Sequence, residues 1–450
     1  MISIMGVVAG LGETGPRPTT SAAAKMLVLS LLAWLGATIS SARPNIILIM
    51  ADDIGQECLS SYGSADYATP HLDALAKRGV RFTQAHSQPL CTPTRVQIMT
   101  GQYNVRNYTK FAELRTTERT FGNDLRDAGY RTAIAGKWQL GRDRALIDEF
   151  GFDEYCLWWL EEKSWRYGDV GHLVVNGEVR PGQSGEYGPE VVNDFVLDFI
   201  DRKAPDDTPF FIYYPMILPH SPFVPTPLSA GDPDPRTQDP AYFKDMVEYM
   251  DLLIGRMVDQ LKSVGELDNT MIIFLGDNGT HSALSTRMID GSLIRGGKSY
   301  TTDGGTHVPF IISWPASTVQ GLVSTDLVDC SDVLPTLHDA AGYEPGEDRI
   351  LDGFSLLPVL RGEGPFQREW SYCWYGQGKD GVLEARDLDV VVFARTARYK
   401  LYRDGRFYDL ARDVLETMPL DAGALDEPTA QVHAELESVI AYFDKVEAAR

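Results

Sequence analysis

The sequence predicts an α/β fold, a large, mostly parallel mixed sheet covered by helices, followed by a smaller C-terminal α+β subdomain. Short apolar, β-branched runs, typical of strands buried on both faces, recur along the chain. Helical patterns lie between them, and this alternation favours a parallel, covered sheet. Four of the runs end within a few residues of a polar group. Ligands of such sheets gather beyond the carboxyl ends of the strands, so these polar groups are the candidate site.

The first half of the chain supplies the clearest strand and helix signals. Their order is a strand over 44–50, a helix over 69–79, a strand over 80–85, a helix over 121–128 and a strand over 130–135. Proline near the start and glycine at the end mark the first of these helices. Asp52 and Asp53 follow the first strand, and Lys137 follows the last.

The second half repeats the pattern and then changes character. The predicted elements are a strand over 209–214, a helix over 241–264 with its apolar residues on one face, and strands over 270–275 and 309–314. His220 follows the first of these strands, and Asp277 and Asn278 follow the second. From about residue 368, short alternating segments over 390–393 and 399–402 precede a helix over 427–446. We therefore predict a boundary near 362–365, which separates a domain over 43–365 from a subdomain over 366–450.

Length and charge narrow the class of protein. The 450 residues, 44% of them hydrophobic, can bury a sizeable core. The formal net charge is −22, from 63 acidic and 41 basic residues. A nucleic-acid partner is not expected on electrostatic grounds, and an anionic substrate would need local attraction at its site.

The N-terminal 42 residues predict a signal peptide with an N-terminal extension. Lys25 precedes the apolar run MLVLSLLAWLGATI, and the small residues Ser40, Ser41 and Ala42 end it. The run is too short for a stable membrane span and fits a secretory signal that is cleaved after Ala42. Translation from Met26 would give a signal of ordinary shape, whereas Met1 adds 25 polar, Gly/Pro-rich residues. We expect a secreted or periplasmic protein.

Five cysteines are an odd number for an exported chain. With Cys91 set aside, the other four are Cys58, Cys156, Cys330 and Cys373. They could form two disulfide bonds in three connectivities, or they could stay buried and free.

Asp52, Asp53, Asp277 and Asn278 predict a metal site. They offer hard oxygen ligands and neither thiolate nor imidazole, which suits Ca²⁺ or Mg²⁺ and argues against Zn²⁺. An Asp-Asp pair after a strand is by itself more often a helix cap or a turn. The second polar pair, in the matching place on another strand, favours the metal.

Cys91 lies in the run SQPLCTPTRVQIMTGQY, where Pro93 predicts a helix that begins just after the cysteine. Residue 91 would then lie at the positive end of the helix, and Arg95 would add a fixed charge, which suits an oxyanion. A lone cysteine is otherwise a small buried hydrophobe, half of a disulfide or a thiol nucleophile.

Six motifs together resemble the type I, formylglycine-dependent sulfatases of the alkaline phosphatase superfamily. In chain order they are NIILIMADD, CTPTR, GKWQLG, LPHSPF, GDNG and the lysine of GGKSYTTDGGTHVPF, and YKLYRDGRFYDL forms a weaker family-like tail. The resemblance runs from about residue 45 to 315 and implies an alkaline-phosphatase-like fold. It also implies that a formylglycine-generating maturation enzyme oxidises Cys91 and that the hydrated aldehyde is the nucleophile.

The resemblance assigns roles to the polar groups at the strand ends. Asp52, Asp53, Asp277 and Asn278 would hold a divalent cation, usually Ca²⁺ with Mg²⁺ possible, and residue 91 would complete its shell. Arg95, Lys137 and Lys298 would surround the sulfate. His220 would protonate the departing alcohol oxygen. The ordinary alternatives are surface ion pairs for the cations and a structural histidine in a Pro-rich turn for His220.

Gln139 departs from the family pattern, because the resemblance implies a histidine at this place in G-K-W-H-L-G. That histidine helps to resolve the covalent sulfate intermediate, and glutamine cannot take a proton although it can hydrogen-bond the nucleophile. His307 is a weak replacement base and is more readily interpreted as a satisfied loop histidine. Asp303 stands where many relatives have glutamate.

Three functional hypotheses follow. The first is an exported sulfatase that acts on sulfated small molecules or glycans, with carbohydrate sulfates as the leading class. The second is a phosphate or phosphonate monoester hydrolase on the same platform. The third is a catalytically impaired glycan-binding relative, because of Gln139. The aromatic segment 158–167 could form the wall of a sugar site or could pack on the sheet.

Overall fold

A computed structural model describes residues 43–231, 233–376 and 390–450 of the chain. The predicted signal peptide, with its possible starts at Met1 and Met26, lies outside the described residues. Within the described part, every helix is too short or too polar to cross a membrane. Residues 43–450 form one compact unit.

A mixed ten-stranded sheet forms the centre of the fold, in the strand order β12-β2-β11-β8-β1-β7-β3-β4-β5-β6. Its strands are β1 (Asn45–Ala51), β2 (Val80–His86), β3 (Arg131–Lys137), β4 (Glu154–Trp158), β5 (His172–Val175), β6 (Glu178–Pro181), β7 (Phe210–Pro215), β8 (Thr270–Gly276), β11 (Phe310–Ser313) and β12 (Leu322–Asp329). The five strands from β8 to β4 are parallel to one another, whereas β11 is antiparallel to both of its neighbours. This confirms the predicted sheet, which is mostly parallel at its centre.

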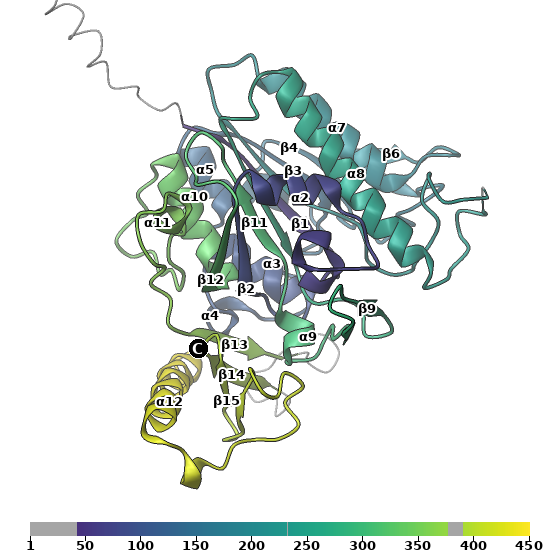
Figure 1. The fold of residues 1–450 in the computed structure, drawn as a ribbon. Coiled ribbons are helices and arrows are strands. Elements are labelled where there is room, and N and C mark those ends of the chain that lie inside the picture. Colours follow the sequence, from purple (N-terminus) through teal and green to yellow (C-terminus); the bar gives the residue numbers. More distant parts are fainter. Residues whose placement is uncertain (1–42, 232, 377–389) are drawn as a thin grey trace, which may run out of the picture. The chain divides into compact units, whose positions relative to one another are not determined.

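Helices cover both faces of this sheet (Figure 1). The helices of the described part are α2 (Pro70–Lys77), α3 (Cys91–Thr100), α4 (Asn104–Asn107), α5 (Phe121–Asp127), α6 (Ala145–Glu149), α7 (Gly188–Lys203), α8 (Tyr242–Ser263), α9 (Asp303–Thr306), α10 (Val333–Ala341), α11 (Leu357–Leu360) and α12 (Glu427–Ala448). Short 3₁₀ turns occupy Gln56–Cys58, Ser60–Tyr62, Cys330–Asp332 and Ala422–Ala424.

Strand β1 shows why its continuous apolar sequence is needed. All seven of its residues are buried, and successive side chains point to opposite faces. Ile46, Leu48 and Met50 join the core beneath α3, α5 and α10. Ile47 and Ile49 join the core beneath α2, α7 and α8. In a strand that is covered on both faces, side chains of either direction enter a core, so the strand ends where the run of polar residues begins.

The C-terminal part adds a second, antiparallel sheet with helix α12 beside it (Figure 1). Its strands are β13 (Ser371–Tyr375), β14 (Val391–Arg395), β15 (Tyr399–Tyr402) and β16 (Phe407–Asp409), in that order. Tyr372, Val392 and Phe443 extend the core of the main sheet. The smaller α+β part is thereby confirmed, while its boundary near 362–365 stays a prediction. A separate hairpin joins β9 (Ser285–Arg287) to β10 (Leu293–Arg295).

Most predicted elements are present within one or two residues of their expected bounds. Helix α3 begins at Cys91 itself, with Leu90 as its N-cap, so the prediction that it starts just after the cysteine is corrected. The five cysteines are all buried and free, which makes the two-disulfide alternative wrong. Strands β4, β5 and β6 and the opposite edge strand β12 were not predicted. β6 and the first part of β12 are exposed and lack a continuous apolar run, whereas β4 and β5 are largely buried but have only five and four residues.

Candidate active site

Two neighbouring parallel strands bring the acidic residues together. Ala51 at the end of β1 pairs with Gly276 at the end of β8, so the residues that follow lie side by side. The backbone N–H of Asp53 donates to Asp277 Oδ1 at 3.0 Å, and that of Asp277 donates to the Ala51 carbonyl at 3.0 Å. Gly279 then packs so closely on helix α9 that an added Cβ would lie 1.9 Å from the Gly304 carbonyl oxygen. The glycine therefore permits the segment after β8 to contact α9.

The donor atoms fit a hard divalent cation. One ligand atom each from Asp52, Cys91 and Asp277 lie within 4.8 Å of one another, and so do atoms of Asp52, Asp53 and His220. Asn278 Nδ2 donates to Asp53 Oδ1 at 3.0 Å, whereas Asn278 Oδ1 is buried without a hydrogen-bond partner in the described part of the chain. A buried carbonyl oxygen with no donor is costly, and a cation would satisfy it.

Three cations face these carboxylates. Lys137 Nζ donates to both oxygens of Asp52, at 2.8 and 3.0 Å. Lys298 Nζ donates to Asp53 Oδ2 at 2.6 Å. Arg95 donates to Asp277 Oδ2 at 3.1 Å and to the Lys137 carbonyl at 3.1 Å. Arg95 is fully buried, so its guanidinium ties helix α3 to the ends of β3 and β8.

The charges of the site are strongly coupled. Burial opposes ionisation of Asp52, but Lys137, His220, Arg95 and Lys298 together outweigh it and hold the pKa of this carboxyl well below its ordinary value. Burial and the nearby Asp52 carboxylate raise the pKa of Asp277 to about 7. Burial likewise opposes protonation of Lys298, yet the Asp53 carboxylate raises the pKa of this ammonium above its usual range. Asp277 thus holds its proton more tightly than an ordinary carboxyl, although Arg95 faces it at 3.1 Å.

Cys91 is the first residue of α3 and is 2% exposed. Its Sγ is the unmodified thiol and stands for the position that an oxidised side chain would occupy. The sulfur lies among the carboxylate oxygens of Asp52 and Asp277. The structure therefore brings residue 91, the acidic residues and the three cations to one end of the sheet.

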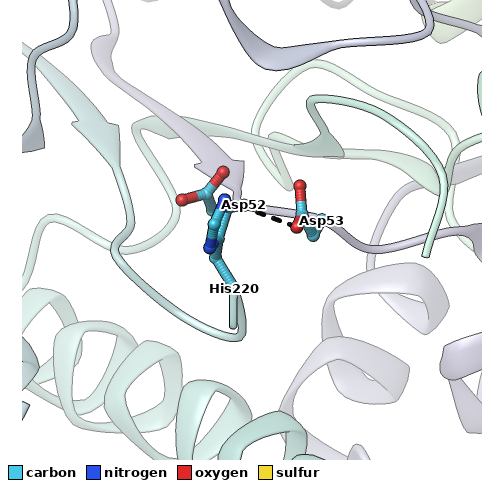
Figure 2. A group of neighbouring side chains, drawn as sticks. All are labelled: Asp52, Asp53 and His220. Atoms are coloured by element: carbon cyan, nitrogen blue, oxygen red, sulfur yellow. Dashed lines mark ion pairs between the residues drawn. The ribbon is translucent and has the colours of Figure 1, made fainter. Parts of the chain in front are cut away.

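His220 joins this group from the segment that follows β7 (Figure 2). Its Nε2 lies 3.1 Å from Lys298 Nζ and 3.6 Å from Asp53 Oδ2. Burial lowers the pKa of His220 to about 4, although the carboxylates of Asp53 and Asp52 favour its protonated form. On the other side of the ring, Arg166 Nη2 lies 2.7 Å from Nδ1 and also donates to the Ser221 carbonyl.

Arg166 is the neighbour of His220 that the sequence did not reveal. It lies in the segment interpreted only for its aromatic residues, and its guanidinium is 4.6 Å from the centroid of the Trp158 ring. An arginine between two aromatic residues is the one signal that could have singled it out.

Gln139 follows β3 in a left-handed backbone conformation, with φ of 57°. The side chain is 2% exposed, and its Oε1 is buried without a hydrogen-bond partner among the described residues. A polar atom left unpaired in this position is consistent with a ligand or water at the site.

His307 and Asp303 belong to a different network. His307 Nδ1 lies 3.0 Å from Gln56 Nε2, and Nε2 lies 2.8 Å from the Thr83 carbonyl oxygen. Asp303 pairs with Arg395 at 2.6 Å. Both ring nitrogens of His307 are engaged away from Cys91, which favours the interpretation as a satisfied structural histidine.

A cavity of about 520 Å³ opens beside His220. Trp158 and Trp165 line it, whereas Tyr167 is fully buried and packs on Tyr187. Part of the aromatic segment 158–167 therefore packs in the core of the protein, and part of it lines the cavity.

The chain matches two families of known proteins. The family model described as sulfatase matches residues 44–343, and the model described as the C-terminal part of N-sulphoglucosamine sulphohydrolase matches residues 297–442. The chain is 30% identical to an arylsulfatase of Hemicentrotus pulcherrimus over 389 residues, 80% of this chain and 68% of that protein. It is 31% identical to the human N-acetylgalactosamine-6-sulfatase over 367 residues, 72% of this chain and 67% of the relative.

Solved structures share the fold at lower sequence identity. Ps i-CgsB superimposes with a TM-score of 0.74 at 24% identity, over 90% of this chain and 93% of the other. The phosphonate monoester hydrolase of Agrobacterium radiobacter gives a TM-score of 0.66 at 22% identity, over 90% and 96% of the two chains. These likenesses confirm the predicted fold class.

Proposed function

Because the chain belongs to the sulfatase family and is a sulfuric ester hydrolase, we propose that it is an exported enzyme that removes sulfate from carbohydrates. The observation that carries this proposal is the meeting of Cys91 with the oxygens of Asp52 and Asp277 at one end of the sheet. In this proposal residue 91 acts as formylglycine, whose hydrated form supplies a hydroxyl nucleophile in place of a thiol.

We assign the cation site to Asp52, Asp53, Asp277 and Asn278, with residue 91 beside them. A set of hard oxygen ligands favours Ca²⁺, and Mg²⁺ is the alternative. When bound, the cation polarises the sulfate oxygens and lowers the pKa of the nucleophilic hydroxyl. The unpaired oxygen of Asn278 and the raised pKa of Asp277 support this assignment, since both are relieved by a cation.

The three cations divide into two roles. Lys137 and Lys298 carry ammonium groups that can exchange a carboxylate for sulfate oxygens and stabilise the charge that develops on them. Arg95 instead positions Asp277 and the end of β3, because its guanidinium is fully buried and bonded to both.

His220 is the proposed general acid. The role of general acid requires the proton on Nε2. Arg166 approaches Nδ1 as a donor, and Nδ1 also lies 2.5 Å from the Ser221 carbonyl oxygen. Because the Lys298 ammonium can only donate, its contact with Nε2 is lost when Nε2 carries the proton. Nε2 would then give the proton to the departing alcohol oxygen, and the carboxylate of Asp53 would favour the protonated ring. Arg166 acts as a positioning residue that fixes the tautomer and orientation of His220.

Carbohydrate sulfates are the proposed substrate class. Curated relatives are named N-acetylgalactosamine-6-sulfatase, and one structure with the same fold is described in complex with D-glucosamine-2-N,6-O-disulfate. The cavity beside His220 has a volume typical of a site for a small ligand, and an indole ring such as that of Trp165 suits the apolar face of a sugar.

The deciding experiment is the mass of the proteolytic peptide that spans residue 91, after expression with a formylglycine-generating enzyme. We expect a peptide lighter by the thiol-to-aldehyde change, together with turnover of 4-nitrophenyl sulfate that exceeds turnover of 4-nitrophenyl phosphate. A thiol that stays intact, or a strong preference for the phosphate, would contradict the proposal. The shared fold of a phosphonate monoester hydrolase makes the phosphate control necessary.

Export is tested separately. We expect N-terminal sequencing of the protein recovered from the periplasm or medium to begin at Arg43, after cleavage at Ala42. Retention of residues 26–42 on cytosolic protein would contradict export without affecting the proposed reaction.

A further inference from the structure

The cavity beside His220 carries positive charge and no negative charge. Lys163, Arg166 and His220 line it together with Trp165 and Gln238, and its lining residues include neither Asp nor Glu. This is unexpected in a chain whose formal net charge is −22. A concave surface with charges of one sign concentrates ligands of the opposite sign.

Lys163 and Arg166 also lack carboxylate partners elsewhere. Within the described residues, neither side chain forms an ion pair within 4.0 Å. Lys163 Nζ instead lies 4.8 Å from the centroid of the Trp159 ring, and its side chain is exposed. Arg166 is 4% exposed and is held by the Trp158 ring, His220 and the Ser221 carbonyl.

The positive charge of Arg166 makes the charged form of Lys163 less favourable. Burial and the neighbouring Arg166 and Lys137 lower the pKa of Lys163. Most other cations near the active site face a carboxylate, as Lys137 and Lys298 do. An anion in the cavity would relieve this repulsion by pairing with the two cations, of which Arg166 is buried and Lys163 is exposed.

The position of the cavity indicates which part of the substrate would enter it. His220 lies between the cavity and the carboxylates of the site, since it lines the cavity and its Nε2 faces Asp53 and Lys298. Because His220 is the proposed donor to the departing oxygen, the group attached to that oxygen occupies the cavity. The sulfate that is cleaved stays with Lys137 and Lys298, on the other side of the ring.

We propose that this cavity binds a second anionic group, a carboxylate or a further sulfate, on the alcohol part of the substrate, and that Lys163 is its main contact. The preferred substrates are therefore sulfate esters whose alcohol is itself acidic, such as uronic acids or multiply sulfated sugars. This inference rests on the proposed function and adds a charge preference to it.

The test uses aryl sulfates with and without a second charge. Because the substituents also change the leaving phenol, the deciding quantity is the change in selectivity between the wild type and Lys163→Gln. The probes are 4-(sulfooxy)benzoate, its neutral methyl ester and 4-(sulfooxy)benzenesulfonate, together with the 3-substituted isomers. The measured quantity is selectivity, the kcat/KM of each doubly anionic probe divided by that of the neutral ester, in the matured full-length enzyme. We expect selectivity above one for at least one isomer, and a fall of about five- to tenfold in Lys163→Gln. Added NaCl should reduce the wild-type selectivity by screening.

Lys445→Gln is the matched control, because this exposed lysine on α12 changes the net charge by the same amount at a distant place. It should leave both rates and the selectivity unchanged. Equal selectivity in the wild type and Lys163→Gln overturns the inference while turnover of the neutral ester upholds the proposed function. Absence of turnover of all probes overturns the proposed function and this inference with it. The carboxylate and sulfonate probes show which anion the cavity prefers.

Discussion

His220 has polar neighbours on both sides of its ring. Arg166 Nη2 and the Ser221 carbonyl oxygen lie at Nδ1, and the Lys298 ammonium lies 3.1 Å from Nε2. Such restraint suits a group that must deliver a proton at one fixed atom. Arg166 could not have been assigned from sequence, since it lies 54 positions from His220. The proposed acid catalysis therefore depends on which ring nitrogen of His220 carries the proton.

We expect His220→Asn to lower kcat/KM for an alkyl or sugar sulfate by about 10²- to 10⁴-fold, the usual contribution of a general acid. The loss should be much smaller with 4-nitrophenyl sulfate, because nitrophenolate departs without a proton. Arg166→Gln should show the same difference between substrates in weaker form. His433→Asn on α12 is the control, and equal losses on both substrates would contradict the assigned role.

Gln139 raises a second question at the residue scale, because an amide cannot take a proton from the nucleophile. We expect Gln139→His to raise kcat by about tenfold, which is less than the usual 10²- to 10⁴-fold contribution of a general base because the site is not built around the new side chain. The gain should increase with pH as the new imidazole loses its proton. Steady-state pH profiles of the wild type, Gln139→His and Gln139→Ala would check this, and a histidine variant no faster than the alanine variant would contradict it.

At the scale of elements, the smaller sheet holds the loop that carries Lys298. Lys400 on β15 donates to the Thr301 carbonyl and pairs with Glu416 at 2.7 Å. Tyr402 on the same strand lies 3.1 Å from the Thr301 hydroxyl, and Arg395 on β14 pairs with Asp303. The second sheet thus contributes to the active site without supplying a residue to it.

Lys400→Met should lower the free energy of unfolding by about 3–5 kcal/mol, because it leaves the Glu416 carboxylate buried without its cation. It should also lower kcat, since the Thr301 carbonyl loses its donor next to Lys298. Lys400→Met/Glu416→Gln should recover most of the stability and little of the kcat. Arg406→Gln, which removes the exposed pair with Asp404, should change stability by no more than about 1 kcal/mol. Recovery of both quantities together in the double variant would contradict the positioning role.

Asp251 joins helix α8 to helix α2 and gives the fold a pH dependence. It accepts from the N–H groups of His71 and Leu72 at the start of α2, at 3.0 and 2.8 Å. Burial raises the pKa of Asp251 from 3.8 to about 6, against the effect of these hydrogen bonds and of His71. Because the folded state holds the proton more tightly than the unfolded chain, this carboxyl makes the protein less stable as pH rises from about 4 to about 6.

The cost of Asp251→Asn should therefore be largest near pH 4 and smaller by up to about 3 kcal/mol at pH 7. Urea unfolding of both proteins between pH 4 and 7.5 would measure it. Asp259→Asn, an exposed change on the same helix, is the control. A cost that is constant over this pH range would contradict the raised pKa.

At the scale of the whole molecule, the proposed cation site joins two central strands. Its four acidic or amide ligands follow β1 and β8, and the helix that begins with residue 91 packs on the same core. Three buried carboxylates at one place are balanced by Arg95, Lys137 and Lys298. A bound cation would add to this balance and stabilise the folded state.

Removal of divalent metal with EDTA should lower the melting temperature by about 3–8 °C, and Ca²⁺ in excess should restore it, because the ion binds only the folded chain. Differential scanning calorimetry with and without Ca²⁺ or Mg²⁺ would measure the shift and rank the two ions. Asp277→Asn should lose the response to added Ca²⁺. A response that is unchanged in this variant would place the cation elsewhere.

Local patterns were sufficient to predict the central strands, most of the long helices and the acidic residues of the site. An apolar run that ends in Asp52 or Asp277 shows both a buried strand and its polar end, and parallel strands bring such ends together. The proline and arginine that follow Cys91 placed it at a helix start within a few residues. These features depend on neighbours in sequence, so the sequence by itself determined them.

Other features depend on contacts between distant segments, and only the tertiary structure decided them. Arg95 turns inward to Asp277 across 182 positions, and Lys400 reaches Thr301 across 99. The same holds for the free state of the five cysteines, for Arg166 beside His220 and for the unpaired charge of Lys163 in the cavity. Hydrophobic periodicity cannot predict such pairs, because it reports only on residues that are close in sequence. The balance of charge around a side chain is set only when the chain has folded and its neighbours are in place.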